Sequence, residues 1–146
     1  MASHKASLSW ARNGQEFKPG KYSTDHPWHF EGGESVMASA AAAYGGNAAL
    51  VDPEQAFTAS LSACHMLTFL HMAAMKGHVV NQYSDDAEGF LGKNDEGRMA
   101  VTRVVLRPKI EFEGDAPDDA TLDQLHHRAH LNCFIANSVS TQIDIE

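Results

Sequence analysis

The stretch DPEQAFTASLSACHMLTFLHMAAMKG, residues 52–77, decides the fold because it carries the signals of one long helix from end to end. Asp52 is a typical N-cap, Pro53 suits the first helical position, and Gln55 stands three residues after the cap, as in a capping box. Lys76 falls in the last turn and Gly77 follows it, as helix C-termini prefer. The sequence therefore predicts a single helix between Asp52 and Gly77.

Apolar side chains cover nearly every side of this predicted helix. They are Ala56, Phe57, Leu61, Met66, Leu67, Phe69, Leu70, Met72 and Met75. A helix that is apolar all round is buried on all sides, so we expect it at the centre of the protein. A membrane span is the alternative at this length, but His65, His71 and four Ser or Thr residues are interleaved. Small residues such as Ala59 and Ala63 would let a second helix approach closely.

The residues before this helix alternate as short strands do. A first strand around residues 6–10 is followed by the turn signal Asn13-Gly14, and a second strand around residues 26–30 ends at Gly32-Gly33. The Ala/Gly-rich residues 38–49 are interpreted as a connecting loop, although their alanines would also permit a helical turn.

After the long helix, the pattern predicts a hairpin, a second helix and a closing strand. Residues 79–91 and 99–112 read as two strands around the turn-rich residues 92–97. A helix is expected over Asp119 to Asn132, and residues 138–145 alternate as a strand. The fold class that follows is α+β, in one domain spanning residues 1–146.

Composition narrows the class of partner. The chain has 146 residues, a net charge of -8 and 21% charged residues. Without a Lys/Arg cluster, neither nucleic acid nor an anionic membrane is an expected partner. The start, Met-Ala-Ser-His-Lys, lacks the apolar segment of a signal peptide, so we expect a cytoplasmic protein. In that compartment a cysteine pair favours catalysis or metal binding over a structural disulfide.

Cys64 and Cys133 are the only cysteines, and three interpretations are open for them. Each can be a buried thiol that packs as a small hydrophobe. A metal site would use Cys64 with His65, and the series His127-x-x-His130-x-x-Cys133, although no strong zinc motif is present. A redox pair would need the two thiols to meet, one ionising to attack and the other resolving the sulfenic acid as a disulfide.

Two motifs resemble the OsmC/Ohr family, the osmotically inducible protein C and organic hydroperoxide resistance group. The first is Val51-Asp-Pro-Glu54-Gln-Ala-Phe with Ser-Ala-Cys64-His65, and the second is Ala129-His-x-Asn-Cys133-Phe-Ile-Ala-Asn137-Ser138-Val. The segment Val101-Thr-Arg-Val-Val-Leu-Arg-Pro-Lys and the order of elements fit as well. The resemblance covers nearly the whole chain.

This resemblance implies a thiol peroxidase that reduces organic hydroperoxides as part of an oxidative stress response. Cys64 would be the peroxidatic thiol, Cys133 the resolving thiol, and Glu54 the glutamate that orients an arginine toward the reactive sulfur. It further implies an OsmC-like fold in which antiparallel sheets wrap a long buried central helix, in an intertwined homodimer. No cofactor is expected; the reductant would be an external dithiol, typically lipoamide.

Glu54 and Cys64 are ten residues apart, which is a rise of about 15 Å on one continuous helix. A glutamate cannot span that distance to act beside its own thiol. Either the helix begins later, or Glu54 serves the Cys64 of a partner chain across a two-fold axis. We expect the second arrangement, in which the homodimer shares its active sites.

The chain departs from the family pattern where the arginine is expected. The strand reads Tyr22-Ser23-Thr24-Asp25-His26-Pro27-Trp28, with Thr24 at the arginine position. Threonine supplies a hydroxyl and no charge. His26 would replace the arginine as a donor if protonated, and Arg12 or Arg103 are further candidates from other strands. Without a replacement cation, Cys64 should ionise less readily. The alternative function is then a non-enzymatic redox sensor or small-hydrophobe binding protein.

Overall fold

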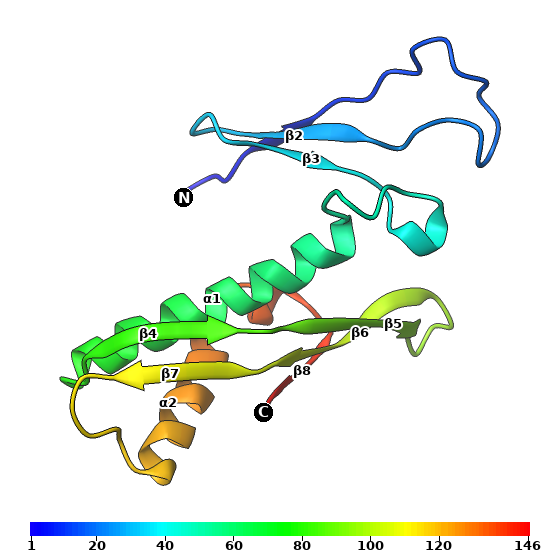
Figure 1. Cartoon of the computed structure of the whole chain (residues 1–146). Helices are drawn as coiled ribbons and strands as arrows, with labels where there is room; N and C mark the ends of the chain where they lie inside the picture. The colour runs from blue at the N-terminus through cyan, green and yellow to red at the C-terminus, as the bar shows by residue number, and fades with distance from the viewer. The chain divides into compact units, whose positions relative to one another are not determined.

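The computed structural model describes residues 1–146 and confirms the α+β class, with eight strands, two α-helices and two short 3-10 turns. The chain divides into a first unit, Met1–Ala56, and a second unit, Phe57–Glu146 (Figure 1). Neither α-helix combines the length and the hydropathy that crossing a membrane requires.

The first unit holds an antiparallel sheet of three strands in the order β1-β2-β3. β1 (Ala6–Leu8) and β2 (His26–Phe30) confirm the two predicted strands, and β3 (Ser35–Ala38) was not predicted. Gly33 has a φ of 100°, a conformation that glycine adopts readily, and the turn it makes returns the chain along β2. The glycine pair thus joins two strands and does not simply end one.

Turns and one short helix complete the first unit. Asn13 and Gly14 have φ of 51° and 77°, which confirms the predicted turn. The expected loop over residues 38–49 contains a single 3-10 turn, η1 (Ala42–Tyr44), as its alanines permit. Between β1 and β2, three aromatic rings pack together, those of Trp10, Phe17 and Tyr22.

The long helix α1 (Pro53–Met75) has the ends that the sequence predicts. Asp52 Oδ1 accepts from the Gln55 amide at 2.8 Å, and Gln55 Oε1 accepts from the Asp52 amide at 3.0 Å, which is a capping box. At the other end, Gly77 has a φ of 80°, and the His78 amide donates to the Ala73 carbonyl at 2.9 Å. This is the bonding pattern of a Schellman C-cap.

The prediction that α1 is buried on all sides is wrong for the single chain. One stripe is buried, formed by Thr58, Leu61, His65, Phe69 and Ala73. The opposite face is exposed, and its apolar members are Ala59, Ala63, Leu67, Ala74 and Met75. The strands and α2 of the same chain cover only one face, so an apolar face of α1 faces outward.

The hairpin is confirmed, but both of its arms are broken. The first arm is split into β4 (Val80–Asp85) and β5 (Glu88–Lys93), and the second into β6 (Met99–Leu106) and β7 (Pro108–Phe112). β4 pairs with β7, and β5 pairs with β6, in separate sheets. At the break, Asp85 Oδ1 accepts from the Arg107 amide at 2.6 Å, and its other oxygen accepts from the Ser62 hydroxyl of α1.

The second helix, α2 (Asp119–Asn132), has the predicted bounds and is capped by Asp118, which accepts from the Thr121 amide. It is followed by η2 (Ala136–Ser138) and the closing strand β8 (Gln142–Ile145). β8 pairs with β6 in parallel, which corrects the expectation of antiparallel sheets alone. The long connection through β7, α2 and η2 lets the chain return in the direction of β6.

Two apolar clusters form the core of the second unit. One joins Phe69 and Ala73 of α1 to Leu125 and Ala129 of α2, with residues of β4 and β7 against them. The other joins Leu61 of α1 to β6 and β8. Figure 1 shows both helices behind the strands of this unit. α1 therefore contributes to both clusters, and Cys64 lies on the helix between them.

Candidate active site

Cys64 and Cys133 meet in the second unit. Cys64 lies in the middle of α1 and is partly exposed, whereas Cys133 directly follows α2 and is only 1% exposed. Both are free thiols, and the Cys133 thiol is close enough to donate a hydrogen bond to the Cys64 sulfur. The sequence requirement for a redox pair, two thiols from different elements in contact, is therefore met.

The surroundings of Cys133 keep its proton on. Burial raises the pKa of the Cys133 thiol to about 11, and the hydrogen bond to Cys64 and the charge of that sulfur act in the same direction. Two backbone amides, of Ala136 and Ile135, oppose this shift, and the Ala136 amide lies 3.4 Å from Cys133 Sγ. Cys133 is thus the buried, protonated member of the pair, and Cys64 is the accessible one.

A pair of histidines lies beside the thiols. His65, one residue after Cys64, is 2% exposed, and its Nε2 lies 3.0 Å from Nδ1 of His126. The planes of the two rings are nearly parallel, with an interplanar angle of 6°, and the ring centroids lie 5.3 Å apart. Burial, with smaller contributions from His126 and His130, lowers the pKa of His65 to about 4, while Asp85 opposes the shift. Burial also lowers the pKa of His126, so both imidazoles are neutral at neutral pH.

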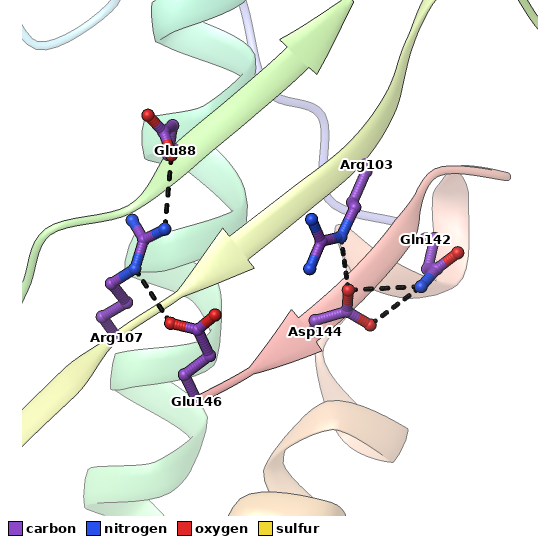
Figure 2. A network of polar contacts seen from close by, with 6 residues as sticks. All are labelled: Glu88, Arg103, Arg107, Gln142, Asp144 and Glu146. Atoms are coloured by element: carbon purple, nitrogen blue, oxygen red, sulfur yellow. Dashed lines mark hydrogen bonds and ion pairs between the residues drawn. The ribbon is translucent and has the colours of Figure 1, made fainter. Parts of the chain in front are cut away.

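Arg103 in β6 and Arg107, between β6 and β7, are bound to acidic groups. Arg103 Nε lies 2.6 Å from Asp144, and its guanidinium stands over the Phe90 ring at 5.7 Å. Arg107 contacts Glu146 at 3.0 Å and Glu88 at 3.3 Å. Figure 2 shows each guanidinium directed at these carboxylates. Arg103, a candidate replacement for the family arginine, is therefore held at the β6–β8 surface.

Thr24 and His26 lie together in the first unit. The Thr24 hydroxyl lies 2.9 Å from the Ser39 hydroxyl and accepts from the Ala40 amide at 3.2 Å. His26 Nε2 accepts from the Trp28 indole at 2.9 Å, and His26 Nδ1 lies 2.6 Å from the Thr24 carbonyl. An accepting Nε2 leaves the proton on Nδ1, which is the neutral tautomer and supplies no positive charge.

Glu54 and Arg12 are the other two predicted site residues. Glu54 lies in the first turn of α1, so the option that the helix begins after it is wrong. Arg12, in the first unit, donates to the Gln15 carbonyl at 2.8 Å. The structure holds no group of three or more His, Cys, Asp or Glu side chains that could bind a metal ion, so the spacing from His127 to Cys133 does not assemble one.

Sequence reasoning did not find the His65–His126 contact or the role of Asp85. The sequence indicated His65 only as a possible metal ligand beside Cys64, whereas in the structure both rings are packed between α1 and α2. The available signal was position: His65 adjoins Cys64, and His126 precedes Cys133 by seven residues, or two helical turns. Only the crossing of α1 and α2 shows that the two rings meet.

Comparison with known proteins establishes the family. The chain matches the family model described as OsmC-like protein over residues 45–146, and it belongs to that family. No match is found among proteins of curated function.

Solved structures share the fold over the full chain. An OsmC-like protein of unknown function from Vibrio cholerae is 45% identical, with a TM-score of 0.95, covering 100% of this chain and 99% of that one. An organic hydroperoxide resistance protein OsmC from Legionella pneumophila is 19% identical, with a TM-score of 0.73, covering 100% and 95%. A second Vibrio cholerae protein, a putative organic hydroperoxide resistance protein with captopril bound in one of its active sites, is 25% identical, with a TM-score of 0.72, covering 100% and 90%.

Proposed function

We propose that this protein is a thiol peroxidase that reduces organic hydroperoxides through Cys64 and Cys133. The Cys64 sulfur attacks the terminal peroxide oxygen, and the O–O bond breaks. Cys64 becomes a sulfenic acid, and the alkoxide takes up the thiol proton and leaves as an alcohol. The Cys133 thiol then condenses with that sulfenic acid, forming the disulfide and releasing water. An external dithiol reduces the disulfide, returns both thiols and becomes a disulfide itself.

The observation that carries this proposal is the contact between two unequal thiols. Cys64 is partly exposed and able to meet a peroxide, and Cys133 is buried against it with its proton held. A resolving thiol need not meet the substrate; it must only reach the sulfenic acid. The pair therefore has the division of labour that a sulfenic acid–disulfide cycle requires.

Organic hydroperoxides are the favoured substrate because of family membership and because neighbouring structures carry the name organic hydroperoxide resistance protein. No bound cofactor is needed for this cycle, since sulfur carries both electrons. The reductant is proposed to be a small dithiol such as lipoamide, which can reduce a disulfide without leaving a mixed disulfide behind.

We propose a homodimer with shared active sites. The exposed apolar face of α1 supports it, because Leu67 and Met75 are 62% and 74% exposed in the single chain. Water contact with such a face is unfavourable, and its alanines allow a second helix to approach. Glu54 and its own Cys64 are ten residues apart on one helix, so Glu54 would serve the thiol of the partner subunit.

A second candidate function rests on Thr24. The family arginine is absent there, the Thr24 hydroxyl is bonded to Ser39 and Ala40, and His26 Nε2 accepts from the Trp28 indole. Without a cation to hold a thiolate, Cys64 would react slowly with peroxide. The protein would then be a redox sensor or a binding protein for small apolar molecules that retains the scaffold.

The test is to mix reduced protein with cumene hydroperoxide and follow intact mass over time. The wild-type chain should rapidly lose two hydrogens as the disulfide forms, and the Cys64→Ser variant should not change. The Cys133→Ser variant is the matched control, because it should gain one oxygen as a sulfenic acid and stop. Wild-type protein that keeps both thiols, or that only slowly gains several oxygens, would exclude the peroxidase and leave the second candidate.

A further inference from the structure

Two contacts join α1 to the α2–Cys133 segment on the side of the thiols. One is the approach of Cys64 to Cys133, and the other is the 3.0 Å contact between His65 Nε2 and His126 Nδ1. On α1 the two contacting residues are adjacent, and on the other segment they are two helical turns apart. The histidine contact therefore fixes α2 at a second point, well away from the thiols along its axis.

Packing around the histidines is close and apolar. His126 lies with its ring 4.6 Å from that of Phe69, and Phe69 belongs to the cluster that joins α1 to α2. His65 is itself buried. An N–H···N bond in such surroundings is partly shielded from water, and it requires one imidazole to donate and the other to accept.

We propose that the His65–His126 hydrogen bond is a positioning device for the resolving thiol: it holds α2 where Cys133 reaches Cys64. The inference rests on the proposed function, because it assigns a role within the Cys64–Cys133 disulfide cycle. His65 and His126 are positioning residues and do not take part in the chemistry. Losing the bond lets α2 shift and lowers the effective concentration of the Cys133 thiol beside Cys64.

Acid should weaken this hydrogen bond, because protonating both imidazoles would place two positive charges next to each other in a largely buried site. The ionisable groups facing the pair are His130 and Asp123 of α2 and Asp85 of β4. Asp85 and Asp123 favour the charged forms, but burial outweighs them. The bond is therefore intact at neutral pH and is lost as the pH falls toward 4.

The experiment measures the disulfide equilibrium with no peroxide present. Full-length protein is equilibrated with mixtures of oxidised and reduced dithiothreitol; the ring disulfide of dithiothreitol breaks, the Cys64–Cys133 bond forms, and two electrons pass to dithiothreitol. His126→Leu removes the hydrogen bond and keeps apolar volume against Phe69. His126→Asn keeps a polar atom near the place of Nδ1, and His127→Leu, at an exposed position on α2, is the matched control.

His126→Leu should lower the effective concentration of the thiol pair about tenfold, the effect of one ordinary hydrogen bond. His126→Asn should restore most of it, and His127→Leu should leave it unchanged. If His126→Leu folds poorly, the double variant His65→Leu/His126→Leu, which leaves no unpaired imidazole, should show the same fall. The wild-type value should also fall as the pH approaches 4, and the Leu variants should not follow.

Two results would count against these ideas, and they are distinct. A wild-type chain that forms the disulfide normally, together with Leu variants at the wild-type value, would overturn the positioning role alone. A wild-type chain that forms no Cys64–Cys133 disulfide at any dithiothreitol ratio would overturn the proposed cycle, and the positioning role with it.

Discussion

The two thiols differ in what surrounds them more than in what they are. Cys133 is 1% exposed and its pKa is raised by burial and by Cys64, whereas Cys64 is partly open. A thiol reacts as its thiolate, so a buried thiol with a high pKa is slow toward any electrophile. The relative rates at which a thiol reagent modifies the two sulfurs therefore measure this difference, and no substrate is needed.

We expect iodoacetamide at neutral pH to alkylate Cys64 at least about tenfold faster than Cys133, because a raised pKa leaves Cys133 little thiolate. Quenching at intervals and mapping the modified peptides by mass measures both rates in one sample. Denatured protein is the control, and there the two rates should converge. Equal rates in the folded protein would show that the burial of Cys133 gives no protection.

His65 makes the stability of the second unit depend on pH. Its pKa falls from 6.5 in the unfolded chain to about 4 in the folded chain. Between these two pH values, His65 is protonated in the unfolded chain and neutral in the folded chain. The contribution is complete above pH 6.5 and is lost as the pH falls toward 4, by up to about 3 kcal/mol. Urea unfolding followed by helical circular dichroism should show this fall in the wild type. His65→Gln should show a smaller slope; the same slope would exclude His65 as the source.

At the scale of elements, the loop after η1 depends on a glycine. A Cβ at Gly46 would collide with the backbone carbonyl of Ala40, and backbone cannot move aside as a side chain can. Gly32 has open space around its missing Cβ and no positive φ. The two positions lie in the same unit and allow a matched comparison.

Gly46→Ala should therefore destabilise the first unit by about 2 kcal/mol, and Gly32→Ala by less than about 0.5 kcal/mol. Both tryptophans, Trp10 and Trp28, lie in this unit, so tryptophan fluorescence during urea unfolding reports it selectively. Similar midpoints for the two variants would mean that the loop rearranges freely around residue 46.

The sequence predicted elements well where their signals were local. The caps of α1 and the bounds of α2 follow from neighbouring residues, and both were confirmed. The break in the hairpin was not predicted, because the contacts that Asp85 makes there are with Arg107 and Ser62, which are distant in sequence. The parallel pairing of β8 with β6 was also missed, because the alternation of apolar and polar residues does not encode strand direction.

At the scale of the whole molecule, the exposed face of α1 leaves apolar side chains in contact with water. We expect Leu67→Glu to weaken self-association by at least about tenfold, because it places a charge in the centre of an apolar face. Leu131→Glu on α2, at a residue 56% exposed, adds the same charge elsewhere and should leave association unchanged. Sedimentation velocity across a dilution series measures both. A wild-type chain that is monomeric throughout would contradict the proposed dimer.

The candidate site was predictable in part. Family motifs in the sequence selected Cys64 and Cys133, and the fold brings them into contact. The burial of Cys133 and the contact of His65 with His126 depend on how α1 and α2 cross, which no local pattern encodes. The neutral state of His26 likewise depends on the Trp28 indole reaching its ring.

The parallel pairing of β8 with β6 has a consequence for how the chain is made. β6 is the central strand of its sheet, and its residues Val104, Val105 and Leu106 are buried in the finished fold. During synthesis, one edge of β6 has no partner until residues 142–145 leave the ribosome. An open apolar strand edge readily pairs with another chain. The nascent protein is therefore most prone to aggregate in the interval between β6 and β8, when holdase chaperones would matter most.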